Sequence, residues 1–141
     1  MMGRRLLLFA LLAVGGCGNV SREGSVFRFE ERGMSCSVEF RSERAVRILV
    51  LPDTASLATR RLATVPSDDP VAVRYTACEE GYAFRTARLE VRYDRTSGRF
   101  SFYDPARGCL LLEEDERSFV PDTVGGEACY GVVQRFRSTE E

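Results

Sequence analysis

Apolar and polar residues alternate along most of the chain with a period of two. In residues 88–93 the apolar side chains share one face and the charged ones share the other, as in a half-buried β-strand. Residues 99–103 repeat this pattern, with phenylalanines at the inward positions. Asp94 and Gly98 provide turn residues between the two segments, so the pattern predicts a β-hairpin.

The same alternation recurs elsewhere in the chain. It appears in residues 27–30, 36–40, 46–50 and 71–75. Residues 109–112 indicate a shorter, more buried strand, and residues 128–137 a last strand whose register is ambiguous. Strands at intervals of about ten residues predict an all-β, mainly antiparallel fold, either a small β-sandwich or a β-barrel.

One segment competes with this all-β interpretation. Residues 52–63 begin with good N-cap residues and place Ala58 and Leu62 four positions apart, as in an amphipathic helix. The segment is short, contains threonines and is followed by Pro66, so a strand and loop fit equally well. We therefore expect at most one short helix.

Composition limits the chemistry that the chain can perform. Its 141 residues are 44% hydrophobic and 29% charged, as expected for one folded domain. The 20 basic residues balance 21 acidic ones, which argues against nucleic acid as a partner. There is no histidine, and every basic residue is arginine, which removes the common catalytic triads, histidine metal sites and Schiff-base lysines. We expect no enzyme activity, no cofactor and no metal.

The N-terminal segment predicts export and lipid attachment. Residues 6–14 are nine apolar residues in a row, which as a helix span about 13 Å, far less than a bilayer core of about 30 Å. The following Val14-Gly15-Gly16-Cys17 resembles the lipobox of bacterial lipoproteins. This resemblance implies that residues 1–16 are a signal peptide and that Cys17 becomes the acylated N-terminus. An ordinary signal peptide cleaved near Gly16 or Gly18 is the alternative.

The lipoprotein interpretation sets the expected domain bounds and location. Residues 17–24 would form the acylated N-terminus and a short tether, residues 25–137 a single β-domain, and residues 138–141 a polar tail. The glycine after the acylated cysteine resembles an outer-membrane sorting signal. We therefore expect a lipid-anchored protein of the bacterial envelope, at the outer membrane and facing the periplasm.

Four cysteines remain once Cys17 is assigned to the lipid. Cys36, Cys78, Cys109 and Cys129 suffice for two disulfides in an oxidising periplasm. Our preferred pairing is Cys109–Cys129 with Cys36–Cys78, because turn-rich sequence lies between the last two cysteines. The other two connectivities remain open. Zinc is the competing use, but the cysteines are widely spaced, with no C-x-x-C pair.

Several polar groups are candidates for chemistry, and each has a simpler explanation. The acidic run 113–116 lacks the spacing of a calcium-binding loop, so we expect a solvated loop. Glu79, Glu80 and Glu90 allow a glycosidase-type carboxylate pair only in principle. The arginines around the predicted hairpin are Arg85, Arg88, Arg92, Arg95 and Arg99. Interleaved acidic residues weaken their combined field.

Two classes of function remain. The first is a non-catalytic interaction or structural module that binds another envelope protein. The second is an inhibitor or ligand-binding barrel, because residues 75–81 are similar to the tyrosine, cysteine and glycine opening of small lipoproteins that inhibit lysozyme. The serine-glycine-x-arginine-tyrosine loop of that family has no match here; residues 96–100 come nearest. A filled core with an exposed apolar patch would favour the first class.

Overall fold

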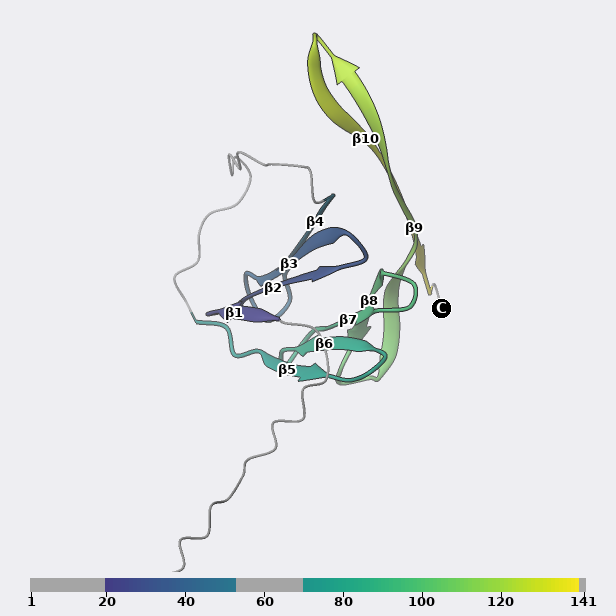
Figure 1. The fold of residues 1–141 in the computed structure, drawn as a ribbon. Helices are drawn as coiled ribbons and strands as arrows, with labels where there is room; N and C mark the ends of the chain where they lie inside the picture. Colours follow the sequence, from purple (N-terminus) through teal and green to yellow (C-terminus); the bar gives the residue numbers. More distant parts are fainter. Residues whose placement is uncertain (1–19, 53–69, 140–141) are drawn as a thin grey trace, which may run out of the picture.

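The computed structural model describes residues 20–52 and 70–139 and folds them into two facing antiparallel β-sheets (Figure 1). The described residues contain strands, turns and bends but no helix, which confirms the all-β prediction in its sandwich form. The expected signal peptide, Cys17 and nearly all of the helix candidate, residues 53–63, lie outside the described residues.

The first sheet has the strand order β1-β2-β3-β4. Its strands are β1 (Ser21–Glu23), β2 (Val26–Glu31), β3 (Met34–Phe40) and β4 (Val46–Pro52). Arg32 and Gly33 form the tight turn between β2 and β3, both with positive φ, as a two-residue hairpin requires. The strand β1 lies within residues 17–24, where the sequence predicted a tether, and pairs with β2.

The second sheet has six strands in the order β10-β9-β8-β7-β6-β5. They are β5 (Arg74–Ala77), β6 (Gly81–Arg85), β7 (Glu90–Asp94), β8 (Arg99–Asp104), β9 (Cys109–Val124) and β10 (Glu127–Ser138). Strands β7 and β8 are the predicted hairpin, which is confirmed. The strand β6 was not predicted, and β9 is much longer than the segment expected for it.

The turn between β7 and β8 explains why this hairpin could be predicted from the sequence. The Asp94 carboxylate accepts hydrogen bonds from the backbone N–H groups of Thr96 (2.7 Å) and Ser97 (3.2 Å). Gly98 then adopts a φ of 73° and donates its N–H to the Asp94 carbonyl at 2.8 Å. Asp104 and Gly108 build the same turn between β8 and β9.

Aromatic rings fill the space between the two sheets. Phe27 lies 4.9 Å from Phe84 between ring centroids, and Phe29 lies 4.9 Å from both Tyr82 and Tyr93. The inward faces predicted from the alternation are confirmed by the buried residues Phe27, Phe29, Phe40, Leu89, Val91, Tyr93 and Phe100. These contacts join strands of different sheets and hold the sandwich closed.

The four cysteines are free thiols, and the preferred disulfide pairing is wrong in this structure. Cys109 begins β9, whereas Cys129 pairs with Asp122, thirteen residues further along β9. A strand of that length separates the two cysteines by about 44 Å, far beyond disulfide reach. Cys36 is 1% exposed between the sheets, whereas Cys78 is exposed, so they are not joined either.

Candidate functional site

Strands β9 and β10 run past the end of the sandwich as a long two-stranded arm (Figure 1). Strand β8 pairs with β9 only as far as Glu113, so the rest of β9 pairs with β10 alone. The two strands are joined by Gly125 and Gly126, both with positive φ. We define the arm as residues 117–134. It projects about 24 Å from Arg117 to its tip, given about 3.4 Å per residue.

The register of the arm determines which side chains share a face. Residues opposite each other in an antiparallel pair lie on the same face. Phe119 is opposite Val132, and Pro121 is opposite Tyr130. These four residues lie on the same face as Gln134, which reaches into the sandwich to bond a buried carboxylate. We call Phe119, Pro121, Tyr130 and Val132 the arm stripe, because they continue the inner face of the sheet beyond the sandwich.

The arm stripe is apolar and accessible. Val132 is 56% exposed, while Phe119 and Tyr130 contact each other edge to face with ring centroids 6.4 Å apart. The opposite face of the arm carries the exposed Val120, Val124 and Val133 together with charged and small polar side chains. Soluble monomers rarely expose continuous apolar surface of this kind. The stripe therefore has the character of a contact surface for another folded unit.

A buried carboxylate fixes the base of the arm. Glu114 has no exposed surface and accepts hydrogen bonds from the Phe100 backbone N–H at 3.0 Å and from the Gln134 amide at 2.9 Å. Arg117 forms an ion pair with Glu114 at 3.3 Å and donates to the Gly98 carbonyl. These bonds link β8, β9 and β10. They also correct the expectation for the acidic run, which is part of a strand rather than a solvated loop.

Of the three glutamates considered for a carboxylate pair, Glu80 and Glu90 line the same groove on the six-stranded sheet and Glu79 does not line it. Glu90 is 7% exposed, forms an ion pair with Arg85 at 3.5 Å, and accepts a hydrogen bond from Arg92. Glu79 and Glu80 are exposed in the turn between β5 and β6. Residues 75–81, which carry the resemblance to lysozyme inhibitors, lie in β5, the same turn and the first residue of β6. Within residues 20–52 and 70–139, no histidine, cysteine or acidic side chains form a group of three able to hold a metal ion.

No helix in the described part of the chain is long and apolar enough to cross a membrane.

The arm was not predicted from the sequence, although the sequence contains a pattern that indicates it. The Gly125-Gly126 pair stands between two segments rich in valine and aromatic residues, which is typical of a two-residue hairpin. The register could not be derived, because a bulge between Arg135 and Phe136 shifts the pairing at the base of the arm.

No protein-family model and no curated protein matches the sequence. Among solved structures, the chain is similar to the GH31 alpha-xylosidase of Xanthomonas citri, with a TM-score of 0.74 and 22% identity over 84% of this chain and 13% of that chain. It is also similar to a GH31 alpha-xylosidase from a soil metagenome in complex with xylose, with a TM-score of 0.55 and 20% identity over 68% of this chain and 14% of that chain. The chain therefore spans about one seventh of these solved chains or less, and the likeness lies in the fold.

Proposed function

We propose that this chain is a non-catalytic interaction module whose arm stripe packs against a glycoside hydrolase catalytic domain, and that a lipid on Cys17 anchors it in the bacterial envelope. The single observation that carries the proposal is the apolar arm stripe, which continues the inner face of the sheet beyond the sandwich and leaves Val132 56% exposed. The similar solved structures support the choice of partner, because they contain this fold as a small part of alpha-xylosidase chains.

A non-catalytic role agrees with the described carboxylates. A glycosidase needs two carboxyl groups facing a shared space, one of them able to exchange a proton with the substrate. Glu90 is held by Arg85 and Arg92. The carboxylate of Glu114 has no exposed surface, accepts two hydrogen bonds and forms an ion pair with Arg117. Both of these carboxylates therefore serve the fold.

The chemistry of the stripe suits a folded partner. Two aromatic rings, a proline and a valine present a rigid apolar surface with few rotatable bonds, so little conformational entropy is lost when it becomes buried. Ion pairs between Glu116 and Arg135 (2.7 Å) and between Asp115 and Arg137 (3.2 Å) surround the base of the arm. Such an apolar centre with a charged rim is the usual composition of a protein interface.

A filled core favours this module over a ligand-binding barrel. Phe27 and Phe84 have no exposed surface and pack against each other between the two sheets. Four of the six exposed large apolar residues of the described chain, Val120, Val124, Val132 and Val133, lie on the arm instead. This is the outcome expected of an interaction module.

Site-specific photo-crosslinking in the native cells tests the partner. A photoreactive phenylalanine analogue at Val132, on the stripe, should crosslink to a glycoside hydrolase catalytic domain identified by peptide sequencing. The same analogue at Val133 is the matched control, because this neighbour is also exposed but faces the opposite way. Equal adducts from both positions, or adducts at Val132 with any other class of protein, would contradict the proposal.

Metabolic labelling with a fatty acid tests the anchor. The unaltered chain should incorporate the label, and Cys17→Ser should abolish both labelling and signal-peptide cleavage, leaving a larger form. Label that persists on the Cys17→Ser protein would refute acylation at this residue.

A further inference from the structure

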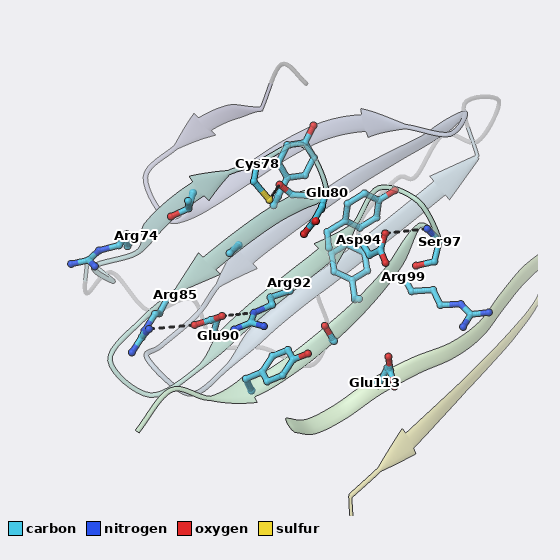
Figure 2. Close-up of a pocket in the computed structure, with 18 residues that line it drawn as sticks. Arg74, Cys78, Glu80, Arg85, Glu90, Arg92, Asp94, Ser97, Arg99 and Glu113 are labelled. Atoms are coloured by element: carbon cyan, nitrogen blue, oxygen red, sulfur yellow. Dashed lines mark hydrogen bonds and ion pairs between the residues drawn. The ribbon is translucent and has the colours of Figure 1, made fainter. Parts of the chain in front are cut away.

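A shallow groove of about 750 Å³ crosses the outer face of the six-stranded sheet, on the side away from the core (Figure 2). Its floor is a row of small side chains that the register aligns across the strands. Thr76 of β5 is opposite Ala83 of β6, and Ser101 of β8 belongs to the same row. Across the strands β5 to β9 this row measures about 19 Å, given about 4.8 Å between neighbouring strands.

Arg92, the large residue in the middle of the row, is directed away from the floor. Arg92 lies between Ala83 and Ser101 in the register, but its Nε donates to Glu90 and its guanidinium lies over the Tyr103 ring, 4.1 Å from the centroid. Glu90 and Tyr103 face each other in the adjacent row. The side chain of Arg92 therefore joins the wall of the groove and leaves the floor low.

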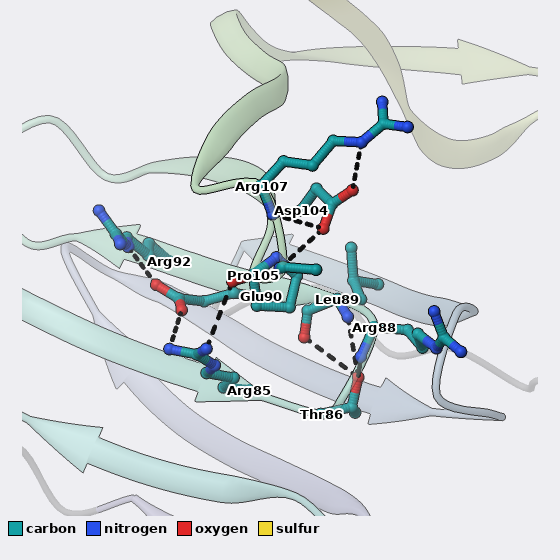
Figure 3. A network of polar contacts seen from close by, with 10 residues as sticks. Arg85, Thr86, Arg88, Leu89, Glu90, Arg92, Asp104, Pro105 and Arg107 are labelled. Atoms are coloured by element: carbon teal, nitrogen blue, oxygen red, sulfur yellow. Dashed lines mark hydrogen bonds and ion pairs between the residues drawn. The ribbon is translucent and has the colours of Figure 1, made fainter.

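The side chains of this wall are ordered by ion pairs in the absence of a ligand. Glu90 is 7% exposed and lies between Arg85 and Arg92, as Figure 3 shows. Arg85 also donates to the Pro105 carbonyl at 3.5 Å. About half of the Arg85 and Arg92 side-chain surface stays exposed despite these bonds. A wall that is already ordered loses little conformational entropy when it binds a ligand.

The charges that line the groove select a neutral ligand. Four arginines are matched by four carboxylates, which are Arg74, Arg85, Arg92 and Arg99 against Glu80, Glu90, Asp94 and Glu113. This balance gives no net attraction for a polyanion such as nucleic acid. The Arg74 side chain, at one end, has no ion pair or hydrogen bond with another described residue, and Thr76 and Ser101 add hydroxyl groups.

A surface of alternating donors and acceptors is complementary to sugar hydroxyls. Each hydroxyl donates one hydrogen bond and accepts others, so neighbouring hydroxyls of a sugar ring can bond a carboxylate and a guanidinium at once. The planar fork of arginine fits such a pair of oxygens. We propose that this groove binds a neutral oligosaccharide that lies across the strands, over the floor of Thr76, Ala83 and Ser101.

Titration calorimetry of the full chain in detergent, with neutral oligosaccharides derived from xylan, glucan and mannan, tests this proposal. At least one of them should bind. Ser101→Arg places a long side chain on the floor and should lower the affinity by about tenfold or more. Ser37→Arg is the matched control, because it makes the same change on β3, opposite Arg28 on the outward face of the other sheet, and it should leave the affinity unchanged.

A second variant keeps the test valid if the first one fails to fold. Thr76→Arg fills the exposed end of the same floor and should weaken binding similarly, with thermal unfolding confirming that each variant is folded. Absence of binding by every neutral oligosaccharide would overturn the proposal. So would unchanged affinity in both folded variants, or binding of a polyanionic polysaccharide in preference to the neutral ones. None of these outcomes depends on whether the arm stripe meets a catalytic domain.

Discussion

The Gln134 amide donates a hydrogen bond to the buried Glu114 carboxylate across 2.9 Å, and this contact joins the outermost strand to the interior of the sheet. Gln134 lies at the base of the arm, two residues from Val132 of the arm stripe. The direction in which the stripe faces is therefore set by a polar contact inside the sandwich. A buried polar group of this kind is stabilising only while all its partners are present.

Glu114→Ala should lower the free energy of unfolding by about 3–5 kcal/mol, because it leaves the guanidinium of Arg117, whose side chain is 12% exposed, without its ion-pair partner. Chemical denaturation of the variant measures this loss. Glu116→Ala, which removes an exposed ion pair with Arg135, is the control and should cost less than about 1 kcal/mol. Similar losses in the two variants would show that the buried network is not what holds β9 and β10 in place.

Phe100→Ala should cost about 3–5 kcal/mol, since Phe100 is 2% exposed and its ring lies 5.0 Å from that of Tyr93. The neighbouring Ser101→Ala alters the outer face of β8 and should change stability by no more than about 0.5 kcal/mol. Denaturant curves of both variants give the comparison. A Ser101→Ala loss as large as that of Phe100→Ala would place the strand in the opposite register.

Gly81→Ala should destabilise the sandwich by about 1–3 kcal/mol or more, because a Cβ at residue 81 would lie 1.9 Å from the Tyr93 carbonyl oxygen on the paired strand. Gly131→Ala offers a matched control within β10. Its Cβ would lie 3.7 Å from the Val120 carbonyl oxygen, an ordinary contact, so this variant should gain up to about 1 kcal/mol. Thermal unfolding of the two variants should shift in opposite directions, and a shared direction would contradict the close approach of β6 and β7.

Cys36 should resist alkylation at about pH 8 in the folded chain, while Cys78 and Cys109, both exposed, should react. Burial raises the pKa of the Cys36 thiol from its ordinary 9.0 to about 11, so its reactive thiolate is scarce at that pH. Mass spectrometry after a timed reaction locates the modified residues. Labelling of Cys36 as fast as Cys78, or a disulfide in the unreduced protein, would contradict the structure.

The same shift in pKa has a consequence for stability. The thiol of Cys36 loses its proton near pH 9 in the unfolded chain but only near pH 11 in the folded one. Between these values the unfolded state binds fewer protons. The contribution of Cys36 to stability is therefore complete below pH 9 and is lost as the pH rises through about 11.

The local pattern predicted the strands whose turn chemistry lies beside them in the sequence. Asp94 and Gly98 close their hairpin through bonds among residues 94–98, so this hairpin was visible without tertiary information. The alternation in residues 88–93 and 99–103 also identified the buried face correctly.

The predictions that were wrong concern features that depend on tertiary contacts. Glu114 looks solvated within an acidic run, and it is buried because Phe100, Arg117 and Gln134 satisfy its oxygens. The pairing of Cys109 with Cys129 looked feasible only while the intervening residues were taken as a compact fold rather than an extended strand. Strand length and bulges are set by neighbouring strands, which a single sequence does not display.

Both sheets are simple meanders in which every strand pairs only with its neighbours in sequence. Strand pairing in each hairpin can therefore start at its own turn, and the entropy lost in closing these short loops is small. Bringing Phe27 against Phe84, which come from different sheets, is the step that joins distant parts of the chain. The folding rate should thus be limited by docking of the two sheets. Substitutions at their aromatic interface should slow folding more than substitutions in the turns.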